Sequence, residues 1–81
     1  MTKSELDYYV YTGREIELTY QEKNYSLTYF RNNGEKWLSF CEFYKDTLDV
    51  SDVDSLLKST YHGIKVSDIF ESLGENDYSL F

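Results

Sequence analysis

Cysteine and proline are nearly or wholly missing from this sequence, and each absence excludes a class of protein. Cys41 is the only cysteine in 81 residues, so neither an internal disulfide nor a site built from several thiolates can form. This composition predicts a protein of a reducing compartment, the cytoplasm. Proline does not occur, which excludes polyproline-type ligand motifs.

Long apolar runs are also missing. No segment approaches the ~20 apolar residues that a membrane-spanning helix needs, and the first residues contain no apolar signal segment. We therefore expect no membrane partner and no export.

The residues that most enzymes need are scarce as well. His62 is the only histidine, and it lies beside Gly63 in a predicted turn, far along the chain from Cys41. A cysteine nucleophile needs a base to activate it, and nothing in the sequence brings Cys41 and His62 together. Glycine-rich phosphate loops and zinc-protease motifs do not occur. The sequence thus predicts a protein that is not an enzyme, has no catalytic residues and needs no cofactor.

Acidic residues are plentiful between positions 46 and 54, where four aspartates occur within nine residues. Oxygen ligands of this kind suit Ca²⁺, but the twelve-residue loop with its central glycine and final glutamate is absent. Asp52 and Asp54 fall in the first turn of a predicted helix, where the helix dipole stabilises negative charge. We therefore predict no metal site.

The overall charge is strongly negative. Lys and Arg number 8 against 15 Asp and Glu, for a formal net charge of −7, while 41% of residues are hydrophobic and 19% are aromatic. Such an apolar fraction predicts a folded chain, and its length predicts one domain, residues 1–81. The negative field repels phosphates, which disfavours direct nucleic-acid binding and favours a basic protein partner, unless the charge serves solubility alone.

Alternating polar and apolar residues predict strands over residues 15–20 and 25–30. Asn33-Gly34 is a strong signal for a two-residue hairpin turn, because both residues tolerate positive φ. Counting outward from this turn places Phe30 opposite Trp37, and it fixes the face on which each side chain lies.

Two faces follow from this register. The first is entirely apolar and should form the core, with Ile16, Leu18, Tyr20, Tyr25, Leu27, Tyr29, Leu38 and Phe40. The second carries Glu15, Glu17 and small polar residues, yet also Phe30, Trp37, Cys41 and Phe43. The hairpin thus has more aromatic residues than its core face uses, and about half of them lie on the face that the polar pattern predicts to be solvated.

The second half of the sequence has helical spacing. Ser51 is a candidate N-cap for a helix beginning near residue 52, with Val53, Leu56 and Leu57 as its apolar stripe. Ser67 is a candidate N-cap for another helix, with Ile69, Phe70 and Leu73 buried and Gly74 as its end. We therefore predict an α+β fold, in which an antiparallel meander of three or four strands is covered on one face by two short C-terminal helices.

The ends of the chain are less determined. Residues 1–13 are predicted to be extended, although Leu6, Tyr9 and Val10 also have helical spacing after a possible cap at Ser4. In either form the segment could cover the second face and turn its aromatic residues into a satellite core. The tail, residues 75–81, could dock on the same patch or remain free as a binding motif.

These observations lead to a predicted partner-binding site. Carboxylates would provide electrostatic steering, and aromatic side chains would anchor the complex. The residues that we assign to this site are Glu15, Glu17, Phe30, Trp37, Asp46, Asp49 and Asp52.

A resemblance supports the same interpretation. REIELTY, KNYSLTYF, W-x-x-F-C-E-F-Y and DVDSLLKS with GIKVSDIFESL, between residues 14 and 73, resemble small uncharacterised proteins of Gram-positive bacteria and their phages. In size, acidity and lack of proline the chain is also similar to phage anti-CRISPR inhibitors. That similarity implies an inhibitor that occupies the nucleic-acid groove of a nuclease. The alternative is a small interaction module, monomeric or homodimeric, that uses its aromatic sheet face.

Overall fold

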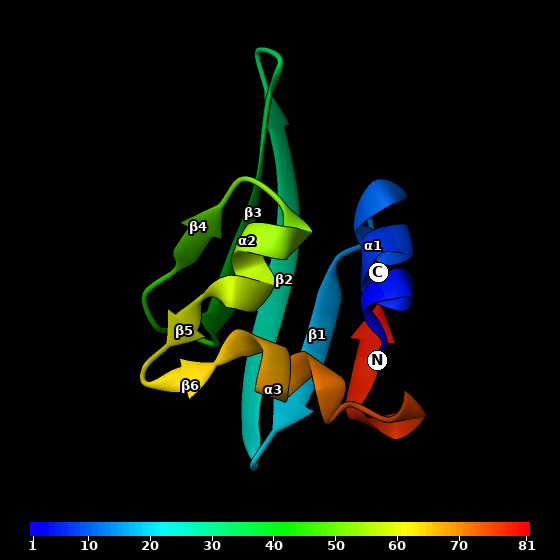
Figure 1. Ribbon diagram of the computed structural model, residues 1–81, viewed down its shortest axis with the longest axis vertical. Coiled ribbons are helices and arrows are strands. Elements are labelled where there is room, and N and C mark those ends of the chain that lie inside the picture. The colour runs from blue at the N-terminus through cyan, green and yellow to red at the C-terminus, as the bar shows by residue number, and fades with distance from the viewer.

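The computed structural model describes all 81 residues as an α+β fold (Figure 1). Three short α-helices accompany one large sheet and one small hairpin. In chain order the elements are α1 (Lys3–Tyr11), β1 (Ile16–Tyr20), β2 (Lys23–Asn32), β3 (Glu35–Glu42), β4 (Leu48–Val50), α2 (Val53–Lys58), β5 (Thr60–Tyr61), β6 (Ile64–Lys65), α3 (Val66–Glu71), a 3₁₀ turn (Glu75–Asp77) and β7 (Tyr78–Leu80).

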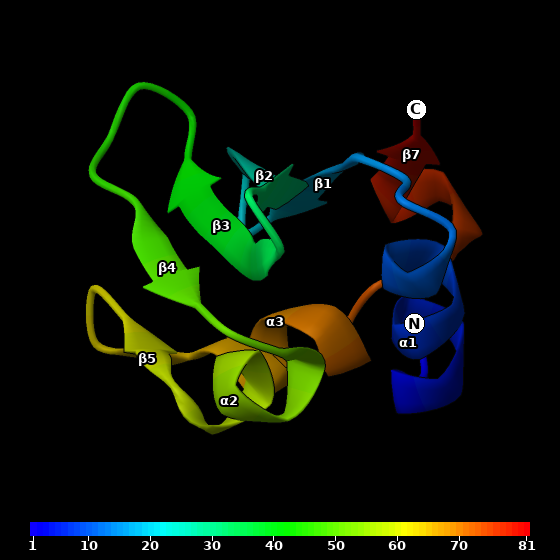
Figure 2. The ribbon, with the colours of Figure 1, turned by 90° about the horizontal axis from the view of Figure 1, so that it is seen from above.

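The large sheet is antiparallel and has the strand order β4-β3-β2-β1-β7. The four consecutive strands form the predicted meander. The sheet has five strands rather than three or four, because β4 and β7 join its two edges. Both are three residues long, too short to show a reliable alternation in the sequence. All three helices lie on the same side of the sheet (Figure 2).

The predicted hairpin register is confirmed. Asn33 and Gly34 form the turn with φ of 53° and 83°, and Phe30 pairs with Trp37. Of the predicted core face, all residues are buried except Tyr20 and Tyr29, which are half-buried. Leu27 and Phe40 pair across the hairpin, at 1% and 0% exposure.

The helical layer closes this core. Val53 and Leu56 are buried from α2, and Ile69 and Phe70 are buried from α3, as predicted, with Leu73 just after it. The predicted caps were wrong. Asp52, not Ser51, caps α2, and α3 begins after Lys65 with no side-chain cap, so that Ser67 lies inside the helix. Gly74 does not end α3 but precedes the 3₁₀ turn.

The N-terminal segment is helical, which corrects the prediction of extended structure. Thr2, rather than Ser4, begins α1 through a capping box, in which its hydroxyl accepts from the Glu5 N–H at 3.1 Å and the Glu5 carboxylate accepts from the Thr2 N–H at 2.9 Å. Leu6, at 1% exposure, inserts into the core from the helix side of the sheet. The segment therefore does not cover the aromatic residues of the other side.

The C-terminal tail neither docks on that aromatic patch nor remains free. β7 pairs with β1, with Leu80 opposite Ile16 and Tyr78 opposite Leu18. The Phe81 N–H donates to the Glu15 carbonyl at 2.8 Å, and Arg14 Nε donates to the Phe81 carbonyl at 2.8 Å. The tail thus becomes the edge strand of the sheet.

Candidate functional site

One side of the five-stranded sheet is covered by no other element, since α1, α2 and α3 all lie on the opposite side (Figure 2). We call this side the outer face. From the confirmed register, the strand residues that point to it are Glu17, Thr19, Asn24, Ser26, Thr28, Phe30, Asn32, Glu35, Trp37, Ser39, Cys41, Asp49 and Ser79.

Charge is sorted between the two sides of the sheet. Glu17, Glu35 and Asp49 point outward from three different strands, and the outer face carries no lysine or arginine from any strand. The three basic residues of the sheet strands, Lys23, Arg31 and Lys36, have the opposite parity and point to the helix side, as does one strand carboxylate, Glu42.

Glu15 extends the acidic array just before β1. Its carboxylate accepts a hydrogen bond from the Thr28 hydroxyl at 3.4 Å, which places it over the outward-facing residues of β2. Two residues along a strand span about 6.6 Å, so Glu15 and Glu17 hold two carboxylates at roughly that spacing. The outer face therefore presents a fixed negative surface.

The predicted aromatic anchors lie on the same face. Phe30 and Trp37 stack with ring centroids 5.4 Å apart and planes inclined by 17°. Phe30 is 42% exposed and Trp37 is half-buried. Trp37 borders a shallow hollow together with Glu35, Asp49 and Lys36, so aromatic and acidic side chains are neighbours there, with one lysine at the edge.

A second hollow lies at the other end of the outer face. It has a volume of about 260 Å³, and its lining includes Glu17, Thr19 and Asn24 together with the ring of Phe43. The Thr19 hydroxyl donates to the Asn24 side-chain carbonyl at 3.0 Å, which fixes these two polar side chains. Phe43 is half-buried there, so aromatic surface borders the acidic face at both of its ends.

Asp46 does not belong to this surface. It lies in the loop between β3 and β4, where its carboxylate is 2.7 Å from His62 Nε2. This hydrogen bond lowers the pKa of Asp46 below its usual value. The Tyr61 hydroxyl donates to the Asp46 carbonyl at 2.6 Å and accepts from the Glu42 N–H at 3.0 Å, and the Tyr61 and His62 rings stack at 4.0 Å. These contacts brace the loop against the β5–β6 hairpin.

Sequence reasoning missed the Asp46–His62 pair, because 16 residues separate the two and no motif links them. A histidine bonded to a carboxylate is part of many hydrolase sites, which also need a nucleophile on the other ring nitrogen. Here Asp46 is the only hydrogen-bonding partner of the ring, with no serine or cysteine bonded to it. The pair explains the position of the loop and does not form a catalytic triad.

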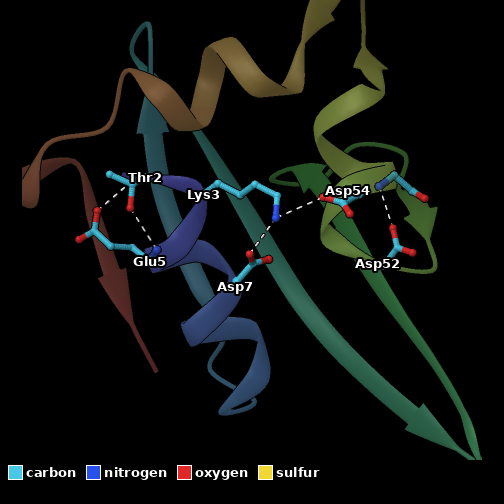
Figure 3. A network of polar contacts seen from close by, with 7 residues as sticks. Thr2, Lys3, Glu5, Asp7, Asp52 and Asp54 are labelled. Atoms are coloured by element: carbon cyan, nitrogen blue, oxygen red, sulfur yellow. Dashed lines mark hydrogen bonds and ion pairs between the residues drawn. The ribbon is translucent and has the colours of Figure 1, made fainter.

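Asp52 is likewise used within the fold. As N-cap of α2 it accepts from the Ser55 N–H at 2.7 Å, and this bond lowers its pKa. Next to it, Asp54 is 3.3 Å from Lys3 Nζ, which also bonds Asp7 at 2.9 Å (Figure 3). The four aspartates between positions 46 and 54 are therefore divided among a loop, the outer face and the helix side.

Other candidate chemistry is limited. No group of three or more His, Cys, Asp or Glu side chains is placed to hold a metal ion. Cys41 is half-buried, with its sulfur 3.7 Å from the Ser26 hydroxyl. None of the helices has the length and apolar composition to cross a membrane.

Comparisons with models of known protein families, with curated proteins and with solved structures found no match to this chain. The function therefore has to be inferred from the chemistry of the outer face.

Proposed function

We propose that this protein is a non-enzymatic binding protein whose outer face occupies a basic, nucleic-acid-binding surface of a partner protein. A phage anti-CRISPR or other anti-defence protein acts in this way on a nuclease. The observation that carries the proposal is the distribution of charge across the sheet: Glu15, Glu17, Glu35 and Asp49 lie on the outer face, and every lysine and arginine of its strands has the opposite parity. Lys36 is the strand cation that lines a hollow at the edge of this face.

Electrostatics supply the first step of binding. A surface of one sign attracts a partner of the opposite sign and raises the association rate, and it repels nucleic acid from the same surface. Glu17, Glu35 and Asp49 belong to a rigid sheet rather than to loops, so they need little ordering on binding. Such a face can replace the phosphates that a basic groove would otherwise hold.

Aromatic side chains supply the second step. Large rings near the centre of an interface often account for most of the binding energy once water is excluded around them. The stacked Phe30 and Trp37 rings adjoin Glu35 and Asp49, so that charge and apolar area would be used together. The two groups of predicted site residues thus share a face, apart from Asp46 and Asp52.

Salt dependence tests the proposal. A protein captured on the immobilised chain should bind with an affinity that falls at least about tenfold as salt rises from roughly 0.05 M to 0.5 M, because the Debye length shrinks over that range. Nucleic acid should compete for the same captured protein. An affinity that does not change with salt, or a complex that nucleic acid leaves intact, would contradict it.

The alternative function is a small interaction module or homodimer that uses the aromatic part of the outer face. The uncovered stack of Phe30 on Trp37 favours it, because exposed aromatic area of this kind marks many interfaces. For a homodimer, Trp37→Ala should halve the mass measured by light scattering. A mass that does not differ between Trp37→Ala and the unaltered protein would reject the homodimer on this face.

A further inference from the structure

The β2–β3 hairpin extends beyond its neighbours in the sheet as a two-stranded arm. β1 pairs with β2 only as far as Leu27, and β4 pairs with β3 only from Leu38, whereas β2 and β3 remain paired to Asn32 and Glu35. Figure 1 shows this arm projecting past α1 and α2. The arm therefore has two unpaired edges. One of its two sides continues the side of the sheet on which the helices lie.

On that side the arm carries two unpaired cations. Arg31 and Lys36 are directly opposite each other in the hairpin, an arrangement of like charges that destabilises a strand pair. Neither side chain forms an ion pair with any residue of the chain. Lys36 lines a groove at the base of the arm without forming an ion pair with the aspartates of that groove, and Arg31 has no carboxylate bonded to it.

At the base of the arm a groove of about 320 Å³ lies between α1 and the start of α2. Its apolar surface comes from Val10 and Tyr11 of α1 and Tyr29 of β2, with Leu38 and Val53 at its bottom. Tyr11 is 89% exposed, although it lines an apolar groove. Tyr29 is half-buried and lies beyond Leu27, where β1 no longer pairs with β2.

The rim of this groove is acidic. Asp7, Asp52 and Asp54 line it, together with Lys36 from the arm, and Lys3 bridges Asp7 and Asp54 (Figure 3). Three carboxylates at the groove thus face two lysines, Lys3 and Lys36, which leaves a small excess of negative charge there, while Arg31 and Lys36 make the adjacent side of the arm positive. Such a surface is complementary to itself.

We propose that a second copy of this chain docks in this groove, forming a two-fold symmetric dimer on the helix side of the sheet. A two-fold axis between groove and arm places Arg31 and Lys36 of each copy against the carboxylates of the other, since the same patch is used twice. Tyr11 and Tyr29 of the two copies then cover one another. The dimer leaves both outer faces free, so it is separate from the partner-binding surface proposed above.

Sedimentation equilibrium tests this proposal. Protein concentrations up to about 1 mM detect a dimer even when its dissociation constant is as weak as that value. The unaltered protein should dimerise, and Tyr11→Ser should raise the dimer dissociation constant at least about tenfold, as loss of an aromatic anchor does. The matched control is Tyr44→Ser, because Tyr44 is 100% exposed and lies in the β3–β4 loop away from the groove. It should leave the dissociation constant unchanged.

Charge reversal gives an independent readout. Arg31→Glu with Lys36→Glu should abolish the dimer, whereas Lys23→Glu with Lys65→Glu, the same change in net charge at exposed positions elsewhere, should affect it far less. Circular dichroism verifies that each variant is folded. A protein that stays monomeric at about 1 mM, equal effects of the two tyrosine variants, or a dimer dissociated by Trp37→Ala but not by Tyr11→Ser would each overturn the proposal.

Discussion

The triple substitution Glu15→Lys, Glu17→Lys and Asp49→Lys is expected to abolish binding of the basic partner. It turns the outer face from uniformly negative to mixed, because it places lysines at three positions where carboxylates now point outward. A like-charge contact across an interface is strongly unfavourable. With about tenfold lost at each position, the affinity should fall by roughly 10³ or more, measured by titration calorimetry at low salt.

A control triple separates the position of the charges from their sum. Glu22→Lys, Asp68→Lys and Glu71→Lys change exposed residues that lie off the outer face, in the β1–β2 turn and in α3. Each exchange adds two positive charges, so both triples take the formal net charge from −7 to −1. The control should lose far less affinity. If the two triples bound equally well, net charge alone would govern binding, and the outer face would not be the site.

Phe40→Ala is expected to have the largest effect on stability. Phe40 is fully buried at 0% exposure, and its ring stacks on Tyr25 at 5.5 Å, packs T-shaped with Tyr61 and lies tilted against Phe70. Truncating a buried phenylalanine costs about 3–5 kcal/mol. That is a large part of the roughly 4–12 kcal/mol expected for a domain of this length. Urea denaturation followed by circular dichroism should show a much lower midpoint, or a protein unfolded before urea is added.

Phe30→Ala provides the matched comparison for that substitution. Phe30 belongs to the same hairpin as Phe40 but points to the outer face, where it is 42% exposed. Its loss should lower the free energy of unfolding by about 1–2 kcal/mol, well below the cost of Phe40→Ala, because only the stacking with Trp37 and part of a fully buried ring's area disappear. A cost close to that of Phe40→Ala would mean that the outer face is covered in the folded protein.

The hairpin illustrates what local sequence can predict. Asn33-Gly34 accepts the two positive φ values of a tight turn at low cost, and the strict alternation of side chains then assigns every residue of β2 and β3 to a face. The predicted aromatic and acidic residues Glu15, Glu17, Phe30 and Trp37 share the outer face for this reason. Each inference required only neighbours along the chain or across one turn.

The missed features depend on segments that are distant in sequence. β4 and β7 are stable only as edges of a sheet that already exists, since three residues cannot form a strand alone. α1 has a weak apolar stripe, and its position depends on Leu6 entering a core formed by residues up to Leu73. Asp46 meets His62, and Asp54 meets Lys3, only after the loops and helices are in place.

Periodicity and one turn thus determined the α+β class, the apolar face of the sheet and the existence of an acidic, aromatic face, because these are properties of side-chain direction along a strand. Only the tertiary structure decided that this second face stays uncovered, that Asp49 joins it while Asp46 and Asp52 do not, and that a groove opens between α1 and α2. Each helix and the tail segment bury their apolar residues against one side of the sheet, and these outcomes depend on which side that is. The side is determined by packing among residues that are far apart in the chain.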